Sequence, residues 1–238
     1  MPHVATIPAA RPTAGARPQT RRLSLSGVIA PLATAVTLLG IAVALVLPPI
    51  LLHPLLDAAG SHLLLGISTA EAHRLSDLTV TELVFGPGSF AFTGPSGGPM
   101  FDAAEIAHLR DARTLLWMFL TAAALSGLAA IMLAIRTDAR LALIRVARGG
   151  AVLVLGVAVL GLVALIAFGP AFEAFHVIFF PGGNWAFSAT QRLVQLYPFA
   201  FWQLVSGLVA ICAASLGLAT WFTARRLGRR LGSAVAAD

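Results

Sequence analysis

The chain has 238 residues, of which 58% are hydrophobic and only 11% carry a charged side chain. Soluble globular domains contain about 25% charged residues, so this composition excludes an ordinary soluble domain and indicates a membrane protein. The net charge of +6 does not indicate a nucleic-acid partner, because the arginines flank apolar stretches and form no basic helix or aromatic and basic stacking surface.

Apolar stretches of membrane-spanning length define the predicted fold. About 20 helical residues cross a hydrocarbon layer roughly 30 Å thick, and four stretches of this chain reach that length. We predict an all-α bundle of four transmembrane helices, with a small extracytoplasmic α+β subdomain between the first two. The predicted spans cover residues 27–52, 114–135, 149–172 and 199–223.

The arginines predict the orientation of the bundle. Arginines beside short loops are retained on the cytoplasmic side of a membrane, and here they lie before the first span, between the second and third, and after the fourth. The only acidic residues on that side are Asp138 and Asp238. Both termini are therefore predicted to be cytoplasmic, with a disordered basic tail over 1–26, a loop over 136–148 and a second tail over 224–238.

The first span resembles a secretory signal, because basic residues precede its apolar run. That run has about 26 residues, whereas the apolar region of a cleaved signal has 7–15, so we predict an uncleaved anchor. Pro48 and Pro49, near its outer end, lack backbone donors and are expected to end or kink the helix.

Two segments are predicted to lie outside the membrane, residues 53–113 as a subdomain and 173–198 as a loop or re-entrant cap. In the first, SDLTVTELVFG and SFAFTG alternate apolar with polar residues around GPG, which predicts a hairpin or short strands. The glycine-rich TGPSGGP at 93–99 predicts a turn or flexible flap. From Phe101 the pattern becomes helical and continues into the second span.

The stretch MFDAAEIAHLRDAR, just before the second span, holds the first candidate functional residues. Asp102 is expected to cap this helix, with Glu105 three residues later as in a capping box. Glu105, His108 and Asp111 recur every three residues and therefore share one face. A solvated polar face at a helix end has the same pattern.

The stretch AFEAFHVIFFPGGNW, after the third span, holds the second candidate histidine, His176, with Glu173 three residues before it. An ionisable residue at membrane depth is unfavourable without a partner, so a functional role is the default hypothesis, with an interfacial anchor as the alternative. The short loop between the second and third spans makes them antiparallel neighbours. His108 and His176 are thus both expected near the outer interface, where they could face one pocket.

These motifs resemble the bacterial lipoprotein intramolecular transacylase family. The resemblance lies in FDAAEIAHLRDA before the second span and in FHVIFF, a tryptophan and LVQLYPFAFW before the fourth, within residues 101–113 and 175–202. It extends to the four-span layout with an outer subdomain between the first two spans. The two motif histidines of the family correspond to His108 and His176.

The resemblance implies a membrane acyltransferase. Such an enzyme moves the sn-2 acyl chain of a diacylglyceryl-modified lipoprotein to the α-amine of the same N-terminal cysteine, which gives a lyso-form lipoprotein. The implied partners are diacylglyceryl lipoproteins and membrane lipid, no cofactor or metal is implied, and the active site would face outward from the bacterial cytoplasmic membrane. The sequence does not indicate an oligomeric state.

Histidines suit this chemistry. An α-amine with a pKa of about 7.7–8 is partly protonated at neutral pH, and histidine, with a pKa near ~6.5, can accept a proton as the amine attacks and return one to the leaving oxygen. The oxyanion of the intermediate also needs hydrogen-bond donors. His108 as imidazolium, Arg110, or the backbone N–H groups of Gly182 and Gly183 are the candidates.

Other side chains are candidates for binding or orienting the substrate. Glu105 or Asp111 could orient a histidine or bind the substrate amine. Aromatic residues could keep water from the ester and so favour transfer over hydrolysis, although aromatic side chains also anchor helix ends at membrane interfaces. The aromatic candidates are Phe175, Phe179, Phe180, Trp185 and Tyr197.

Two other functional classes remain open from the sequence. E-x-x-H occurs at Glu105–His108 and Glu173–His176, which is half of a di-iron carboxylate site, but the first and fourth spans contain no Asp or Glu for the other half. A non-enzymatic accessory subunit or haem b carrier is the second alternative. Haem would require histidines facing each other across spans, and none lies mid-span.

Overall fold

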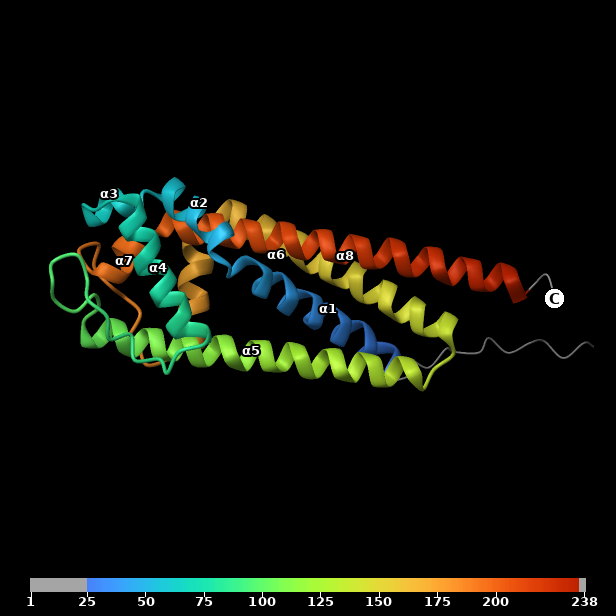
Figure 1. Ribbon diagram of the computed structural model, residues 1–238. Coiled ribbons are helices and arrows are strands. Elements are labelled where there is room, and N and C mark those ends of the chain that lie inside the picture. The colour runs from blue at the N-terminus through green and yellow to red at the C-terminus, as the bar shows by residue number, and fades with distance from the viewer. Residues whose placement is uncertain (1–24, 236–238) are drawn as a thin grey trace, which may run out of the picture.

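The computed structural model describes residues 25–235, and within them the chain forms eight helices. Four long helices run side by side, and four short ones gather at one end (Figure 1). The predicted tail over 1–26 lies almost entirely outside the described residues. The long helices are α1 (Leu25–Val46), α5 (Ala103–Ile135), α6 (Ala139–Phe179) and α8 (Phe199–Val235), and the short ones are α2 (Pro49–Ala59), α3 (Ser61–Leu65), α4 (Thr69–Val84) and α7 (Arg192–Leu196).

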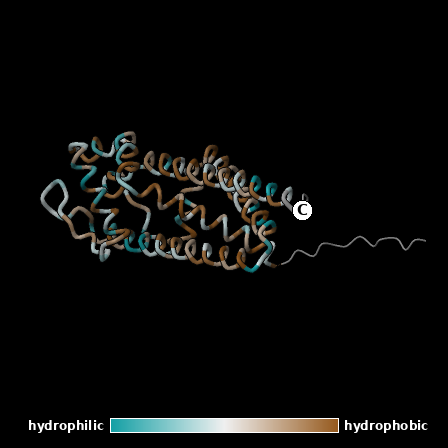
Figure 2. Tube along the Cα trace, turned by 45° about the vertical axis from the view of Figure 1, so that its right-hand side comes forward, coloured by the Kyte–Doolittle hydropathy of each residue, from teal (hydrophilic) through white to brown (hydrophobic). Residues whose placement is uncertain are grey.

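The four long helices are long and apolar enough to cross a membrane. Hydrophobic residues follow their length, whereas hydrophilic residues gather at the two ends of the bundle (Figure 2). Leu165 and Ile166 of α6, for example, are 84% and 78% exposed, which suits a surface that faces lipid. Backbone groups in a bilayer must be bonded internally, and these helices satisfy that condition. The chain is a multi-pass membrane protein.

The first long helix, α1, lies between α5 on one side and α6 and α8 on the other (Figure 1). Small residues allow this close packing: a Cβ added at Gly40 of α1 would lie only 2.3 Å from the Cβ of Ala123 in α5. The helix ends at Val46, and α2 begins at Pro49. The prolines therefore end the first span as predicted, although some residues earlier than 52.

The predicted strands of the outer subdomain are wrong. SDLTVTELVFG lies almost wholly in α4, and the isolated bridge between Thr93 and Pro99 is the β pairing found in the described residues. The helix starts because the Ser68 hydroxyl accepts from the Glu71 N–H, and its Leu75 and Thr79, one turn apart, are both buried. Over so short a stretch, strand alternation and helical spacing match the same apolar residues. The subdomain is helical rather than α+β.

Helix α6 continues beyond the predicted end of the third span at residue 172, because it bends instead of stopping. Ala167 has non-helical dihedral angles (φ −144°, ψ 50°) three residues before Pro170. Proline has no N–H to donate, and its ring clashes with the preceding turn. Beyond this kink the last turns of α6 point toward α5 (Figure 1). The first part of the predicted 173–198 loop is therefore helical.

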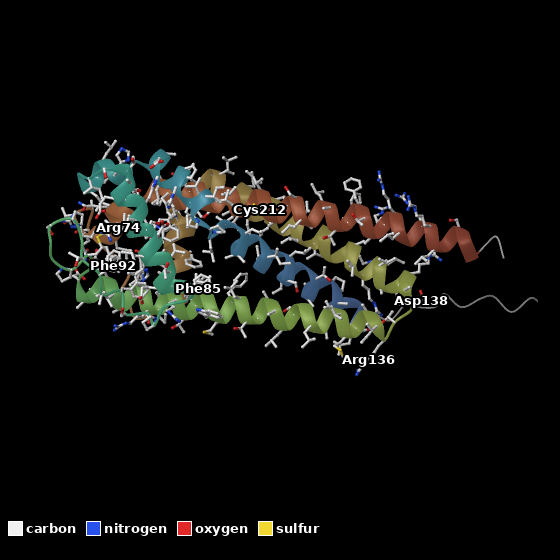
Figure 3. All side chains as sticks on the ribbon, viewed as in Figure 1. Arg74, Phe85, Phe92, Arg136, Asp138 and Cys212 are labelled. Atoms are coloured by element: carbon white, nitrogen blue, oxygen red, sulfur yellow. The ribbon has the colours of Figure 1, made fainter. Side chains whose placement is uncertain are left out.

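The short helices pack into a core that caps one end of the bundle. Leu56 of α2, Leu75 of α4 and Leu196 of α7 are fully buried together. At the opposite end, α8 runs on to Val235, so the predicted 224–238 tail is helical as far as it is described. In Figure 3, Arg136 and Asp138 mark the end of the bundle where α5 turns into α6, and Arg74 marks the opposite end, where the short helices lie.

Candidate active site

His108 is positioned by the start of α5. The Asp102 carboxylate accepts from the Glu105 N–H at 2.8 Å, and the Glu105 carboxylate accepts from the Asp102 N–H at 2.8 Å, which forms the predicted capping box. His108 lies one turn after Glu105. It precedes the apolar part of α5, which begins at residue 114, so it stands outside the membrane-spanning segment.

His176 is positioned by the end of α6, beyond the kink. Its side chain is buried, and its Nδ1 lies 2.7 Å from the carbonyl oxygen of Phe172 in the preceding turn. A carbonyl oxygen can only accept a hydrogen bond, so this contact assigns the proton of the neutral ring to Nδ1. The lone pair of Nε2 is then free to accept a proton from another group.

The structure brings the two predicted histidines together. The ring centroids of His108 and His176 are 5.9 Å apart, with the ring planes inclined by 27°. Within the described chain, His108 Nδ1 is buried and has no hydrogen-bond partner. Burial, with a smaller contribution from nearby His176, lowers the pKa of His108 to about 4. This low pKa favours the neutral ring of His108 near pH 7 over the imidazolium form.

Aromatic rings surround the histidine pair. Phe180 contacts both, with ring centroids 4.7 Å from His108 and 5.4 Å from His176, and Trp185 lies 5.0 Å from His176. The other predicted phenylalanines differ: Phe175 contacts His176, whereas Phe179 packs on Phe175 and is 49% exposed.

Two aromatic neighbours of the pair are absent from the sequence-based prediction. Phe172 lies 4.2 Å from His176 between ring centroids, and Phe187 lies 5.5 Å from His108. Phe172 stands four residues before His176, so helical spacing could have identified it. Phe187 follows an irregular turn, and no local pattern indicates its direction.

The two acidic candidates on the face of His108 both contact the segment that follows α6. Glu105 is 2% exposed and accepts from the Leu193 N–H of α7 at 2.7 Å, in addition to its capping-box bond. Asp111 accepts from the Asn184 side chain at 2.7 Å. The predicted shared face is therefore confirmed. Both carboxylates bond to the segment that carries Phe187. The sequence did not indicate Asn184 as a partner of Asp111.

Arg110 and Tyr197 form hydrogen bonds within the cap of short helices and loops rather than with the histidines. Arg110 Nε donates to the Gly88 carbonyl at 3.0 Å, and the Tyr197 hydroxyl lies 3.1 Å from the Ser76 hydroxyl. Burial raises the pKa of Tyr197 to about 12, so it stays protonated. Its ring contacts are with Phe201 and Trp202 rather than with the histidines.

The remaining candidates lie in the turn after α6 and in the E-x-x-H motifs. Gly182 and Gly183 form an exposed turn, with Gly183 at φ +72°, a conformation that favours glycine. Glu173 is exposed, and both oxygens of Glu105 accept from backbone amides. Among residues 25–235, no group of three or more His, Cys, Asp or Glu side chains could hold a metal ion. The di-iron alternative thus finds no ligand set there.

The chain is similar to a known protein family and to solved structures of that family. The family described as lipoprotein intramolecular transacylase Lit matches residues 82–202. This range includes both histidines and the segment that joins α6 to α8. No curated protein matches the chain. The structure of the membrane-integral lipoprotein intramolecular transacylase Lit from Bacillus cereus is similar, with a TM-score of 0.73 and 17% identity over 88% of this chain and 97% of that chain.

Two variants of the Bacillus cereus protein, with one histidine replaced by arginine or by alanine, have the same fold. Each gives a TM-score of 0.71 and 16% identity over 88% of this chain, and the matches cover 93% and 94% of those chains. The structural likeness establishes the fold, and the family match covers just over half of the 238 residues. The chain therefore belongs to the lipoprotein intramolecular transacylase Lit family and is a membrane enzyme.

Proposed function

We propose that this enzyme transfers the sn-2 acyl chain of a diacylglyceryl-modified lipoprotein to the α-amine of the same N-terminal cysteine, giving a lyso-form lipoprotein. The observation that carries the proposal is the pair of imidazoles 5.9 Å apart, enclosed by aromatic rings beside the outer end of the membrane spans. A diacylglyceryl group held in the lipid layer could reach such a site without leaving the membrane.

His176 is the proposed general base. Its Nδ1–H is held by the Phe172 carbonyl, which directs the free Nε2 lone pair away from its own helix. As Nε2 removes a proton from the α-amine, the nitrogen attacks the carbonyl carbon of the sn-2 ester, and a tetrahedral intermediate forms. The bond to the sn-2 oxygen then breaks, that oxygen takes up the proton held by His176 Nε2, and an amide and a free hydroxyl result.

His108 is the proposed hydrogen-bond partner of the reacting oxygen atoms. Its neutral ring carries one N–H, and its buried Nδ1 has no partner within the described chain. A buried polar atom without a partner is unfavourable, so a group of the bound substrate would satisfy it. A donor already oriented in a site of low water content stabilises a developing oxyanion more than one in water does.

The aromatic residues are proposed to control the outcome of the reaction. Water at the ester would release the acyl chain as a free fatty acid instead of transferring it. Phe180 contacts both histidines, Trp185 contacts His176 and Phe187 contacts His108. These rings leave little room for water around the reacting atoms. The outward location of the site follows from the arginine-rich opposite end and is part of the proposal.

Glu105 and Asp111 are proposed as positioning residues rather than as ligands of the substrate amine. Their carboxylates hold Leu193 and Asn184, and these contacts set where Trp185 and Phe187 lie. A rigid supporting shell of this kind keeps reactive groups in a productive geometry.

The direct test follows a labelled acyl chain. The purified full-length protein in detergent is given a synthetic diacylglyceryl peptide whose sn-2 chain alone is deuterated, together with an unlabelled peptide of different mass. We expect deuterium in the N-terminal amide of the first peptide and none in the second. Release of the label as free fatty acid, or its transfer to the second peptide, would contradict the proposed reaction.

A further inference from the structure

The end of the bundle opposite the histidines contains a cavity between α6 and α8. Its volume is about 340 Å³. Residues at helical spacing supply both walls, so one face of each helix lines it. From α6 these residues are Arg140, Leu143, Ile144 and Ala147, and from α8 they are Ala224, Arg225, Gly228, Arg229 and Gly232.

Within the described residues, Arg140, Arg225 and Arg229 line this cavity without an acidic partner. In the described part of the chain, the ion pairs join residues of α2 and α4, at the other end of the molecule. The acidic residue nearest to Arg140 in sequence, Asp138, accepts from the Leu141 N–H as the cap of α6. The one nearest to Arg229, Asp238, lies outside the described residues. The Arg225 guanidinium lies 4.7 Å from the centre of the Trp221 ring, a contact that orients the guanidinium without supplying a negative charge.

The cavity is amphipathic along its length. Because α6 and α8 are antiparallel, Ala147 and Ala224 lie at the side of the cavity nearer the middle of the bundle, and Arg140 and Gly232 lie at its mouth, nearer the helix ends. Glycine leaves the mouth open: a Cβ added at Gly232 would lie 3.7 Å from the guanidinium carbon of Arg140. The cavity therefore presents positive charge at the membrane surface and an apolar wall below it.

We propose that this cavity binds an anionic phospholipid, with its phosphate on Arg140, Arg225 and Arg229 and the start of an acyl chain along the apolar wall. Basic pockets between transmembrane helices bind anionic lipid headgroups in this way, and the guanidinium group suits phosphate geometry. The bound lipid would bridge α6 and α8 far from the histidines, so it is distinct from the lipoprotein substrate. This site does not depend on the proposed reaction.

A neighbouring cavity at the same end shows the contrast. It lies between α1 and α6 and is lined by Arg148 and otherwise by apolar residues and Gly27. One arginine at the edge of an apolar surface suits any lipid, whereas three around one cavity select for negative charge. Selectivity for anionic headgroups is therefore the property to measure.

The chain offers a matched pair of variants for this test. Arg225→Gln/Arg229→Gln removes two arginines that line the cavity, and Arg226→Gln/Arg230→Gln removes two exposed arginines of α8 that do not. Both variants lose the same charge from the same helix. Full-length protein in detergent is titrated with phosphatidylglycerol, phosphatidylcholine or inorganic phosphate, and bound adducts are counted by native mass spectrometry. Loss of one arginine that contacts anionic lipid is expected to lower the apparent affinity for that lipid about fivefold.

We expect one saturable phosphatidylglycerol adduct whose apparent affinity falls about 30-fold in Arg225→Gln/Arg229→Gln and less than about threefold in the control pair. Gly232→Leu keeps every charge but fills the mouth of the cavity, and it should also lower the affinity at least tenfold. Equal loss in both arginine pairs, unchanged binding in Gly232→Leu, or equally tight binding of phosphatidylcholine would overturn the proposal. Inorganic phosphate that prevents binding at the same concentration would also overturn it, because the ligand would then be a soluble anion.

Discussion

The two ends of this membrane enzyme use their charged side chains in different ways. At the end that carries the histidines, Glu105, Arg110 and Asp111 bond to backbone or side-chain groups of other segments, and the histidine pair lies enclosed among them. At the opposite end, Arg225 and Arg229 line an open cavity and have no carboxylate partner among residues 25–235. Charged side chains hold neighbouring segments in place at the first end, and at the second end they are proposed to bind anionic lipid.

This contrast follows from what each end must do. A reaction site needs its groups held within fractions of an ångström, and hydrogen bonds that carboxylates accept from neighbouring segments provide that constraint. An inner membrane surface requires only net positive charge, which acts over a Debye length and tolerates mobile side chains. Substitutions of the same chemical type should therefore have unequal effects at the two ends.

The largest effect is expected at the histidine pair. His176→Ala should lower formation of N-acylated lyso-lipoprotein roughly 10²–10⁴-fold, because general acid–base assistance is lost. His108→Ala should fall in the same range, and the double variant should be little worse than the worse single one, since residues that act as a unit are not additive. Mass spectrometry of the lipoprotein N-terminus measures the product.

The control for the histidine pair is His53→Ala, which removes the pairing of His53 with Asp77 in the cap. It should leave the rate within a few-fold. His176→Gln keeps hydrogen bonding but cannot take up a proton near neutrality, so a near-normal rate for this variant would disprove the base assignment.

The next effect separates the two ends by their side of the membrane. In a Cys212→Ala background, single cysteines replacing exposed Ser96 and Ala189 should react with a membrane-impermeant thiol reagent in intact cells, whereas one replacing exposed Ala139 should react only after lysis. Mass shift of the purified protein reports the labelling. Reaction of the Ala139 variant alone would invert the orientation and place the histidines on the cytoplasmic side.

A smaller effect is expected at Glu105. Glu105→Ala leaves the backbone N–H groups of Asp102 and Leu193 without their acceptor. Leu193 is buried, and an unsatisfied buried donor costs about 1–3 kcal/mol. Thermal unfolding in detergent should therefore shift downward together with activity. Exposed Glu173 provides the control, and Glu173→Ala should change neither. Lost activity with an unchanged unfolding temperature would instead make Glu105 a substrate-binding group.

The smallest effect is expected at the exposed contact between Asp111 and Asn184. Asp111→Ala and Asn184→Ala should each lower the rate by only a few-fold, because one exposed hydrogen bond contributes about 0.5–1.5 kcal/mol. If the two act only through each other, the double variant should match either single one. Additive losses in this cycle would give Asp111 a separate role, such as binding the substrate amine.

Much of the site could be predicted from the sequence, because the features that indicate it are short motifs or follow from the order of the helices. The capping box of Asp102 and Glu105 involves residues three apart, and the meeting of His108 and His176 follows from two antiparallel helices joined by a short loop. Sequence reasoning did not identify the partner of Glu105, since Leu193 is 88 residues away. It also placed strands where α4 lies, because alternation over a short stretch does not separate the two structures.

By itself the sequence determined the number of helices long and apolar enough to cross a membrane and their order along the chain, since hydrophobic length is a property of contiguous residues and needs no partner. Tertiary structure decided how those helices form a site. The kink at Ala167, the burial of His176 beside Phe172 and the tie from Glu105 to Leu193 depend on which surfaces meet after the helices pack. Such contacts are chosen by the free energy of the whole assembly, and no short stretch of the chain specifies them.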